Sequence, residues 1–339
     1  PISYVAPDPR YVDEVHALLT SIMPDVEDMK YLLKTISLGL IGDNLLEEFY
    51  IWIGAGANGK GILRDMIAIT FGEYFDSLEI EYLGKTKHQG HANSADPVMA
   101  RKKNCRIVIS TEPEGDVNLK CGRLKQISGR DPVQSRDLYK SSFNFVPKFK
   151  LIIQTNVEVG VDGHEPAIVR RLRFIPFPNT FVDDPKLPNE RKIDRTLKER
   201  IKGEQYRIAF FHILLDHYRE FVEKDGNKLE MPERIKQSTK NYLCDNDPVQ
   251  QFIDDRLEKT NDKNDTITSS NMYEFFKSYY DDDAKAMSIK MFKSAMQSKG
   301  FVQKRTNKSN IYQYVIHDIH DKDEDVENDN EKNNEEINQ

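Results

Sequence analysis

A glycine-rich segment, Gly54-Ala-Gly-Ala-Asn-Gly-Lys-Gly61, has the residue types and spacing of a phosphate-binding loop. It directly follows the apolar run 48–53 and precedes a helical pattern over about 60–70. Glycines let successive backbone N–H groups curl around phosphate oxygens, and the helix N-terminus adds a positive dipole end. We therefore expect ATP binding, with Lys60 reaching the β- and γ-phosphates; a glycine-rich turn without a ligand is the alternative. The predicted nucleotide-binding residues are Gly54, Ala55, Gly56, Ala57, Asn58, Gly59, Lys60 and Gly61.

Gly61 departs from the usual form of this loop. Ser or Thr normally follows the lysine, and its hydroxyl group ligates Mg²⁺. With glycine in that place, the metal must gain a water molecule or another ligand. Thr70 or a more distant hydroxyl could replace the missing group, and weakened hydrolysis is the other outcome that the sequence leaves open.

A second motif follows the apolar run 106–110, which ends in Thr111-Glu112-Pro-Glu114. Carboxylates at the end of a buried strand can hold Mg²⁺ and act on the water molecule that attacks a phosphate. Strands often end in polar residues, but the position after a phosphate-binding loop strengthens this assignment. We favour Glu112 as the catalytic carboxylate and Mg²⁺ ligand because it lies closer to the strand end, with Glu114 as the second candidate.

Two further motifs complete the candidate site. The apolar run 149–154 ends in Thr155-Asn156, whose amide could orient the attacking water and touch the γ-phosphate; a turn-forming asparagine is the alternative. Arg170 and Arg171 follow shortly after. Arginine has a planar, permanently charged group that binds phosphate through two hydrogen bonds. Either arginine could therefore reach a phosphate on a neighbouring subunit, and a structural ion pair is the alternative for each.

The elements that must position these residues alternate between strands and helices. Continuous apolar runs predict buried parallel strands, and apolar residues spaced by three and four predict helices. The alternation favours an α/β core. Within it, 118–128 has helical spacing, and 133–136 and 142–146 flank a polar tip, as in a hairpin. The predicted strands are 48–53, 106–110, 149–154 and 172–176.

Helical patterns flank this core on both sides. Helices are predicted before it at 11–22 and 26–40, and after it at 189–200, 204–224 and 232–243. The last part has the order helix, helix, helix, hairpin, as in a winged-helix domain. Its basic residues gather on the third helix and the hairpin, with a solvated charged face as the alternative: Lys290, Lys293, Lys304, Arg305 and Lys308. The predicted segments are a helical lead-in (1–46), the core (47–185), a helical segment (186–246), a winged-helix-like domain (247–316) and a disordered acidic tail (317–339).

Composition argues against a membrane-spanning protein and against a fold held together by zinc or disulfides. The 339 residues are 38% hydrophobic and 31% charged, and no apolar run approaches the ~18 residues that span a bilayer. The net charge of −7 comes from the tail, whose net charge is −8, whereas 101–173 carries +7, which suits a surface that tracks a nucleic-acid backbone. Scattered Cys105, Cys121 and Cys244 argue against a zinc site or disulfides and fit a reducing, intracellular setting. We expect His88 and His91 to lie in a solvated loop rather than bind metal.

Taken together, the motifs resemble those of superfamily 3 helicases, most closely the poxvirus-type primase–helicases of large DNA viruses and related phage and plasmid primases. The resemblance covers roughly 15–316. No single motif is specific, but their order is. The segments that carry it are the 54–61 loop, the strand end at Glu112, Leu124-Lys-Gln-Ile-Ser-Gly-Arg-Asp131, Arg136-Asp-Leu-Tyr139, Phe149-Lys-Leu-Ile-Ile-Gln-Thr-Asn156 and Arg170-Arg-Leu-Arg-Phe-Ile-Pro-Phe177.

The resemblance implies an α/β, AAA+-like P-loop ATPase core with a helical lead-in and a C-terminal winged-helix-like domain. It implies a homo-hexameric ring around DNA, with ATP and Mg²⁺ bound between subunits. Lys60, Glu112 and Asn156 would come from one subunit, and an arginine finger, Arg170 or Arg171, from the next. The family usually translocates 3′ to 5′ on single-stranded DNA.

The resemblance also implies a hairpin that points into the ring channel, with its tip at about 138–142. Tyr139 would stack on a base or sugar, and Lys140 would hold a phosphate. Lys125, Arg130 and Arg136 would support the hairpin or the subunit interface. The DNA-binding residues expected on this basis are Lys125, Arg136, Tyr139 and Lys140.

The function expected from these motifs is an ATP-dependent ring helicase that unwinds duplex DNA during viral-type genome replication, with single-stranded or forked DNA as its binding partner. The alternative, which Gly61 favours, is a nucleotide-binding, DNA-binding ring or scaffold with weak hydrolysis. A small-molecule kinase explains neither the hairpin nor the paired arginines. Because the chain begins at Pro1, we expect it to be excised from a longer protein. The resemblance implies an upstream primase domain, other replication proteins as partners and action at viral replication sites in the host cytoplasm.

Overall fold

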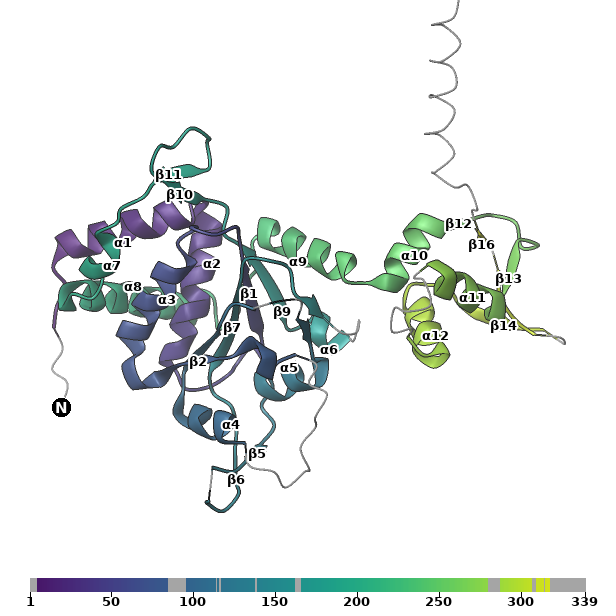
Figure 1. Ribbon diagram of the computed structural model, residues 1–339, viewed down its shortest axis with the longest axis horizontal. Helices are drawn as coiled ribbons and strands as arrows, with labels where there is room; N and C mark the ends of the chain where they lie inside the picture. The colour runs from purple at the N-terminus through teal and green to yellow at the C-terminus, as the bar shows by residue number, and fades with distance from the viewer. Residues whose placement is uncertain are drawn as a thin grey trace, which may run out of the picture. The chain divides into compact units, whose positions relative to one another are not determined.

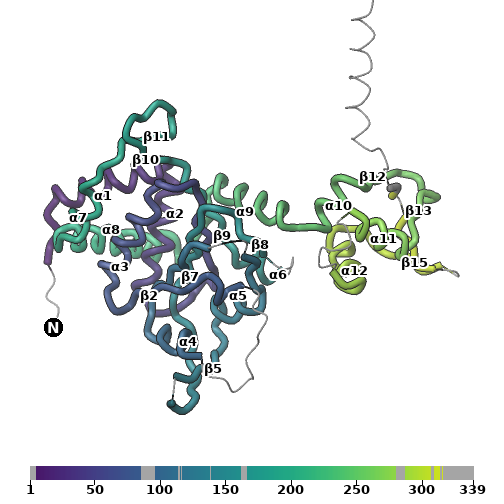
Figure 2. The backbone as a smooth tube through the Cα atoms, viewed as in Figure 1, coloured from purple at the N-terminus to yellow at the C-terminus, as the bar shows by residue number. Residues whose placement is uncertain are grey.

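The computed structural model describes residues 5–84, 96–113, 115, 117–137, 139–161, 166–279, 287–306, 309–313 and 315–317. The chain forms two compact units, one that ends at Asn246 and one that begins at Asp247. Figures 1 and 2 show their elements. Some residues named in the predictions lie outside the described residues: Glu114, Leu138 at the hairpin tip, the pair His88 and His91, Lys308 and the acidic tail beyond His317.

The described part of the first unit is built on a five-stranded parallel sheet with the order β2-β3-β7-β1-β9 (Figure 1). The predicted α/β core with buried parallel strands is confirmed. Because all the strands are parallel, their carboxyl ends meet at one edge, and β7 lies between β1 and β3. The strands are β1 (Phe49–Ile53), β2 (Phe75–Leu78), β3 (Ile107–Ser110), β7 (Lys150–Thr155) and β9 (Leu172–Pro176).

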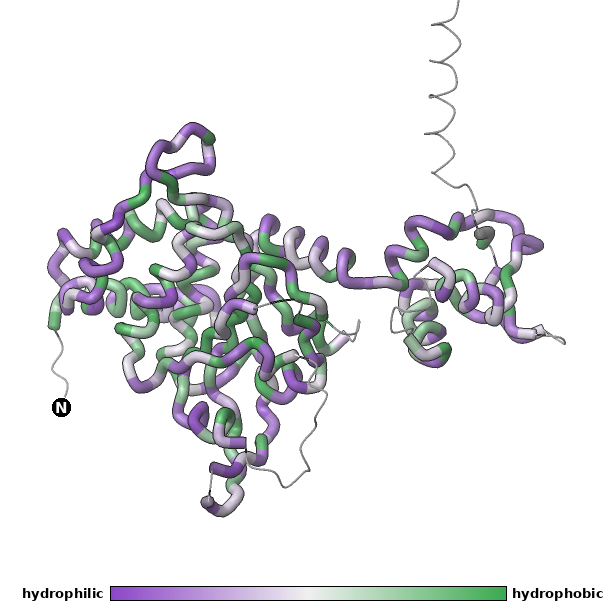
Figure 3. The backbone as a smooth tube through the Cα atoms, in the orientation of Figure 1, coloured by the Kyte–Doolittle hydropathy of each residue, from purple (hydrophilic) through white to green (hydrophobic). Residues whose placement is uncertain are grey.

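Helices cover both faces of this sheet. Successive residues of β1 alternate between the faces, so that Tyr50 and Trp52 join one apolar cluster and Phe49 and Ile51 the other. In Figure 3 the sheet strands are largely hydrophobic. The first cluster includes residues of α1 (Pro9–Ile22), α2 (Val26–Ser37), α3 (Lys60–Phe71) and α8 (Glu204–Glu223). The second includes residues of α4 (Pro97–Arg101), α5 (Cys121–Ser128), α6 (Pro166–Val169) and α9 (Glu233–Asp245).

Smaller elements join these layers. The predicted hairpin is confirmed, because β5 and β6 pair antiparallel, and Figure 1 shows it projecting beyond the central sheet. The paired strands are β5 (Val133–Ser135) with β6 (Phe143–Phe145), β4 (Asn118–Leu119) with β8 (Gly160–Val161), and β10 (Thr180–Val182) with β11 (Glu190–Lys192). Short 3₁₀ helices are η1 (Leu38–Leu40), η2 (Gly72–Tyr74), η3 (Ile80–Tyr82) and η4 (Lys102–Asn104).

The helix predicted at 189–200 is wrong over most of its length. Residues 190–192 form β11, and only α7 (Leu197–Arg200) is helical. The Glu190 carboxylate accepts hydrogen bonds from the backbone N–H groups of Lys186 and Leu187, at 2.6 and 3.0 Å. Such a local side-chain to backbone bond competes with a helix, and pairing with β10 then fixes the segment as a strand.

The second unit contains the predicted three helices followed by a hairpin, as in a winged-helix domain, but two strands that were not predicted lie between the first and second helices. A three-stranded antiparallel sheet with the order β13-β15-β14 packs with three helices around Phe252, Phe276 and Phe292 in its described part. The rings of Phe276 and Phe292 lie 4.6 Å apart. The elements are α10 (Pro248–Arg256), β12 (Leu257–Lys259), β13 (Thr266–Thr268), α11 (Ser269–Tyr279), α12 (Ile289–Ser298), β14 (Gln303–Arg305), β15 (Asn310–Gln313) and β16 (Val315–His317).

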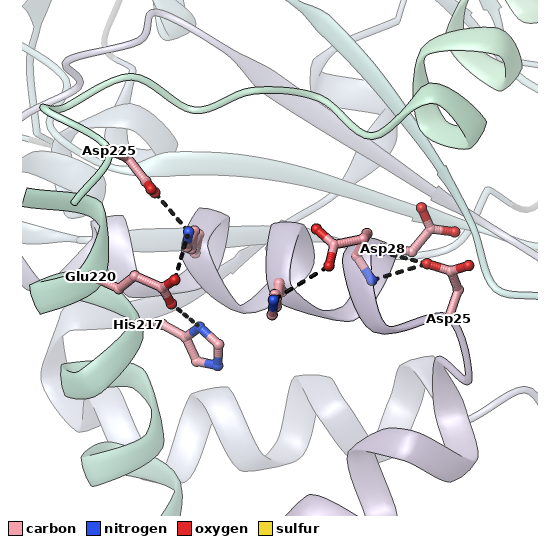
Figure 4. A network of polar contacts seen from close by, with 8 residues as sticks. Asp25, Asp28, His217, Glu220 and Asp225 are labelled. Carbon is pink, nitrogen blue, oxygen red and sulfur yellow. Dashed lines mark hydrogen bonds and ion pairs between the residues drawn. The ribbon is translucent and has the colours of Figure 1, made fainter.

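A polar network ties helix α2 to α8 in the first unit (Figure 4). The Lys34 side chain, 11% exposed, lies 2.6 Å from Asp225 and 3.7 Å from Glu220. His217 Nδ1 lies 4.0 Å from the Glu220 carboxylate. Burial lowers the pKa of His217; Glu220 opposes this effect, and Lys34 and His16 strengthen it.

This pKa shift predicts a pH dependence of stability. Unfolded His217 takes up a proton more readily than the folded residue, so stability is lost as the pH falls below about 6.5. The thermal midpoint of the wild type should therefore drop more between pH 7.5 and 5.5 than that of His217→Gln. His212→Gln, on the same helix, is the matched control and should retain the wild-type drop. Equal drops in all three proteins would contradict the assignment.

Candidate nucleotide-binding site

The 54–61 loop connects β1 to α3 and is held in shape by its own residues. Gly59 has φ 85°, and a Cβ there would lie 2.6 Å from Ile22 Cγ1, so only glycine fits. The Asn58 amide donates to the Ala55 carbonyl oxygen, and its oxygen accepts the Lys60 N–H at 3.2 Å. The Phe181 N–H donates to the Ala57 carbonyl oxygen at 2.7 Å. The loop is therefore braced from inside and from β10.

Lys60 joins the loop to the neighbouring strand ends. The residue is 1% exposed, and its ammonium group donates to the Gly54 carbonyl oxygen at 2.7 Å and to Asn156 Oδ1 at 3.0 Å. Asn156 Nδ2 in turn donates to Glu112 Oε2 at 2.7 Å. Burial lowers the pKa of Lys60 to about 8, and Glu112 opposes this effect. The structure thus places the three predicted residues in one hydrogen-bonded chain.

These side chains line a cavity of about 400 Å³ at the carboxyl edge of the sheet. Sequence analysis missed some of its lining residues: Arg64, Asp65, Gln154 and Lys198. The Gln154 side-chain oxygen is buried without a hydrogen-bond partner among the described residues. Asp65 follows Gly61 by one helical turn. This spacing in the sequence could have predicted that the Asp65 carboxylate faces the same cavity.

The cavity contains groups that suit a hydrated Mg²⁺ bound to phosphate oxygens. Glu112 and Asp65 both line it, and carboxylates are ligands that Mg²⁺ accepts. The described residues contain no group of three His, Cys, Asp or Glu that could hold a metal by protein ligands alone. Thr70 is not among the cavity-lining residues, so the structure gives no support for its hydroxyl as the substitute for Gly61.

The two candidate arginines have different environments. Arg171 is 8% exposed; its guanidinium group pairs with Glu47 and donates to the Ala167 carbonyl oxygen at 3.1 Å. These contacts fix Arg171 within its own chain, as a structural ion pair. Arg170, at the end of α6, is exposed. Of the two, Arg170 is therefore the side chain placed to reach another molecule.

The hairpin residues are exposed as a DNA-contacting tip requires. Tyr139 is fully exposed, with φ 60°. The Lys140 side chain is 71% exposed, and its ammonium group lies 2.8 Å from Asp137. Lys125 lies on α5, and Arg136 follows β5, where its carbonyl oxygen accepts the Asp96 N–H at 2.9 Å.

Arg130, expected to support the hairpin or the subunit interface, forms an ion pair with Asp43 within the first unit.

Comparisons with known proteins agree with this architecture. A putative helicase of Acanthamoeba polyphaga mimivirus is 28% identical over 283 residues, 80% of this chain and 29% of the relative. A putative helicase of Frog virus 3 is 27% identical over 79% of the chain and 28% of the relative. A putative primase of African swine fever virus is 26% identical over 70% of the chain and 25% of the relative. The chain thus spans less than a third of the length of these relatives.

Solved structures show the same fold. The apo structure of the C-terminal region of NrS-1 matches with a TM-score of 0.52 at 14% identity, over 93% of this chain and 77% of that chain. No family model matches the sequence. The resemblance to viral helicase and primase proteins is confirmed. No helix in the described part of the chain is long and apolar enough to cross a membrane.

The lowered pKa of Lys60 predicts how nucleotide affinity depends on pH. If Lys60 contacts the phosphates, its charged form is the one that binds them, so nucleotide affinity should fall as the pH rises through about 8, approaching about tenfold per pH unit above that value. Titration calorimetry with a non-hydrolysable ATP analogue from pH 7 to 9.5 measures this. Lys60→Arg, whose charge persists over the range, is the control and should show a much flatter profile. A flat wild-type profile would show that Lys60 does not bind the phosphates.

Proposed function

We propose that this chain is the motor portion of an ATP-dependent DNA helicase that acts in the replication of a large DNA virus. The observation that carries the proposal is the hydrogen-bonded chain of Lys60, Asn156 and Glu112 in one cavity. The names of its viral relatives support the same role. ATP, with Mg²⁺, is the proposed cofactor.

The three hydrogen-bonded residues Lys60, Asn156 and Glu112 would act together in hydrolysis. Lys60 would place its charge on the β- and γ-phosphates, and the braced loop would supply backbone N–H groups. Asn156 would position Glu112 through their 2.7 Å hydrogen bond. Glu112 would then accept a proton from the attacking water. Bound Mg²⁺ would neutralise charge on the phosphates, held by Glu112 and Asp65 directly or through water.

Assembly into a homo-hexameric ring would complete the site. Arg170 is exposed, and an arginine supplied by a neighbouring subunit can stabilise the charge that develops on a transferred phosphoryl group. We therefore assign Arg170, rather than the buried Arg171, to contact the nucleotide of the next subunit. The same proposal includes movement of the ring 3′ to 5′ on single-stranded DNA. It also includes an upstream primase domain, other replication proteins as partners and action in the host cytoplasm.

The hairpin would contact single-stranded DNA in the ring channel. The Tyr139 ring is free to stack on a base or sugar. The ion pair of Lys140 with Asp137 is largely exposed, and such pairs are weak, so a DNA phosphate can replace the aspartate. ATP-driven movement of the hairpin would then pull one strand through the ring.

The hairpin assignment predicts that Lys140→Ala keeps ATP binding but loses strand displacement on forked DNA. The substitution removes one phosphate contact. The slope of log affinity for single-stranded DNA against log salt should therefore become less steep by about 0.7. Lys186→Ala is the matched control, because Lys186 is also exposed and paired with a nearby aspartate. Unchanged unwinding by Lys140→Ala would exclude this role for the hairpin.

A second candidate function, a DNA-binding ring that hydrolyses ATP weakly, is favoured by Gly61. A Cβ at this position would meet nothing within 4 Å, so Gly61→Ser should fold normally and restore the hydroxyl ligand. A rise in ATP turnover of tenfold or more in the variant, measured with Mg²⁺, would identify the natural protein as a weakened motor. Equal turnover in the two proteins would show that other groups, such as Asp65, already hold the metal.

A further inference from the structure

The buried side-chain oxygen of Gln154 is a polar group that the proposed ATP site has not used. Gln154 lies in β7, two residues before Asn156, and is 6% exposed. It lines the same cavity as the phosphate-binding loop, and its oxygen has no hydrogen-bond partner in the part of the chain that the structure describes. A buried acceptor without a partner is costly. A hydrogen-bond donor bound in the cavity would remove this cost.

The alternation of β7 places the Gln154 side chain on the face of the sheet that α3 covers. Ile152 belongs to the apolar cluster that α3 joins, whereas Leu151 and Ile153 belong to the cluster on the opposite face. Residues two apart in a strand share a face, so Gln154 points to the same side as Ile152. The Gln154 backbone N–H donates to the Oγ atom of buried Ser110 at 3.2 Å. This bond fixes Gln154 beside the end of β3.

Helix α3 contributes Gly61 and Asp65 to the lining of this cavity. A Cβ on Gly61 would meet nothing within 4 Å. The structure therefore has space at the position where other phosphate-binding loops carry the hydroxyl group that ligates Mg²⁺. Asp65 lies one helical turn further along, and helical side chains tilt toward the N-terminus of their helix. The Asp65 carboxylate is therefore directed toward the space beside Gly61.

The chemistry of these groups indicates which ligand they fit. The Gln154 amide oxygen and the carboxylates of Asp65 and Glu112 all accept hydrogen bonds. Nucleotide phosphates are acceptors too, so they cannot satisfy the Gln154 oxygen. The Lys60 ammonium group is a donor in the same cavity, but it is bonded to two other oxygens. Mg²⁺ usually keeps several water molecules in protein sites, and these waters donate hydrogen bonds. A hydrated Mg²⁺ beside the phosphates therefore fits this set of acceptors.

We propose that Gln154 is a positioning residue for Mg²⁺, and that its side-chain oxygen accepts a hydrogen bond from a water molecule in the hydration shell of the metal. Together with Asp65, Gln154 takes over the task of the hydroxyl group that Gly61 lacks. This role rests on the proposed binding of ATP with Mg²⁺. It identifies a residue outside the phosphate-binding loop that lets the loop hold Mg²⁺ with glycine after the lysine.

Binding of a fluorescent, non-hydrolysable ATP analogue to the full chain, measured with Mg²⁺ and again with EDTA, tests this role without requiring turnover. The quantity compared is the factor by which Mg²⁺ raises the affinity for the analogue. Gln154→Leu should lower this factor about tenfold or more, because residues that hold the ligands of a metal typically contribute this much to metal affinity. The thermal midpoint should not fall, since the substitution removes an unpaired buried oxygen.

Thr70→Val is the matched control for this measurement. The Thr70 hydroxyl oxygen is also buried without a hydrogen-bond partner among the described residues, and Thr70 lies on α3, but it does not line the cavity. The control should therefore keep the wild-type factor.

A second pair of variants separates a role in holding Mg²⁺ from a structural role. In the Gly61→Ser protein, the serine hydroxyl can ligate Mg²⁺ itself. Adding Gln154→Leu to Gly61→Ser should therefore cost much less of the Mg²⁺-dependent affinity than the same substitution costs in the wild type. A packing defect at Gln154 would persist in both backgrounds.

Two results would overturn the role of Gln154. One is an unchanged Mg²⁺ factor in Gln154→Leu. The other is an equal loss with and without the serine, which would assign the oxygen to another group, such as Arg64, whose Nε atom is also buried in the described structure without a partner. Failure of the wild type to bind the analogue at all, with or without Mg²⁺, would instead overturn the proposed ATP site and this role with it.

Discussion

The hydrogen bonds of the buried Lys60 ammonium group connect the phosphate-binding loop to the neighbouring strand end. A lysine that is 1% exposed needs oxygen partners to stay charged, and here they come from the loop itself and from the end of β7. Asn156 extends the connection to Glu112 at the end of β3. The parallel sheet is what makes this possible, because it brings three carboxyl strand ends to one edge. The packing of α1 against the loop, through Ile22 and Gly59, limits how the loop can move.

Much of the fold could be predicted because burial leaves a clear pattern in the sequence. Strands β1, β3, β7 and β9 are nearly continuous apolar runs, since helices cover both faces. Edge strand β2, with the sequence Phe-Asp-Ser-Leu, is only partly buried and has no such run. The three-residue strands β12 and β13 depend on pairing with distant partners, so local sequence did not reveal them.

The candidate site was predictable to the extent that it follows strand ends. Lys60, Glu112 and Asn156 each come directly after or near the end of an apolar run, and the structure places them together. The roles of Arg64, Asp65 and Gln154 depend on which side of an element faces the cavity, and this is set by tertiary packing. Arg170 and Arg171 are identical in type and adjacent in sequence. Only the partner Glu47, more than a hundred residues away, separates the buried one from the exposed one.

The measurement that tests the central proposal most directly is ATP hydrolysis by the purified chain with Mg²⁺, with and without single-stranded DNA. We expect turnover that DNA stimulates and that Lys60→Ala abolishes while the variant keeps the wild-type thermal midpoint within a few degrees. Turnover retained by a folded Lys60→Ala protein would contradict the assignment of the cavity as the catalytic site. Nucleotide binding without turnover, in the presence of DNA, would contradict the motor and leave the weakly hydrolysing ring as the function.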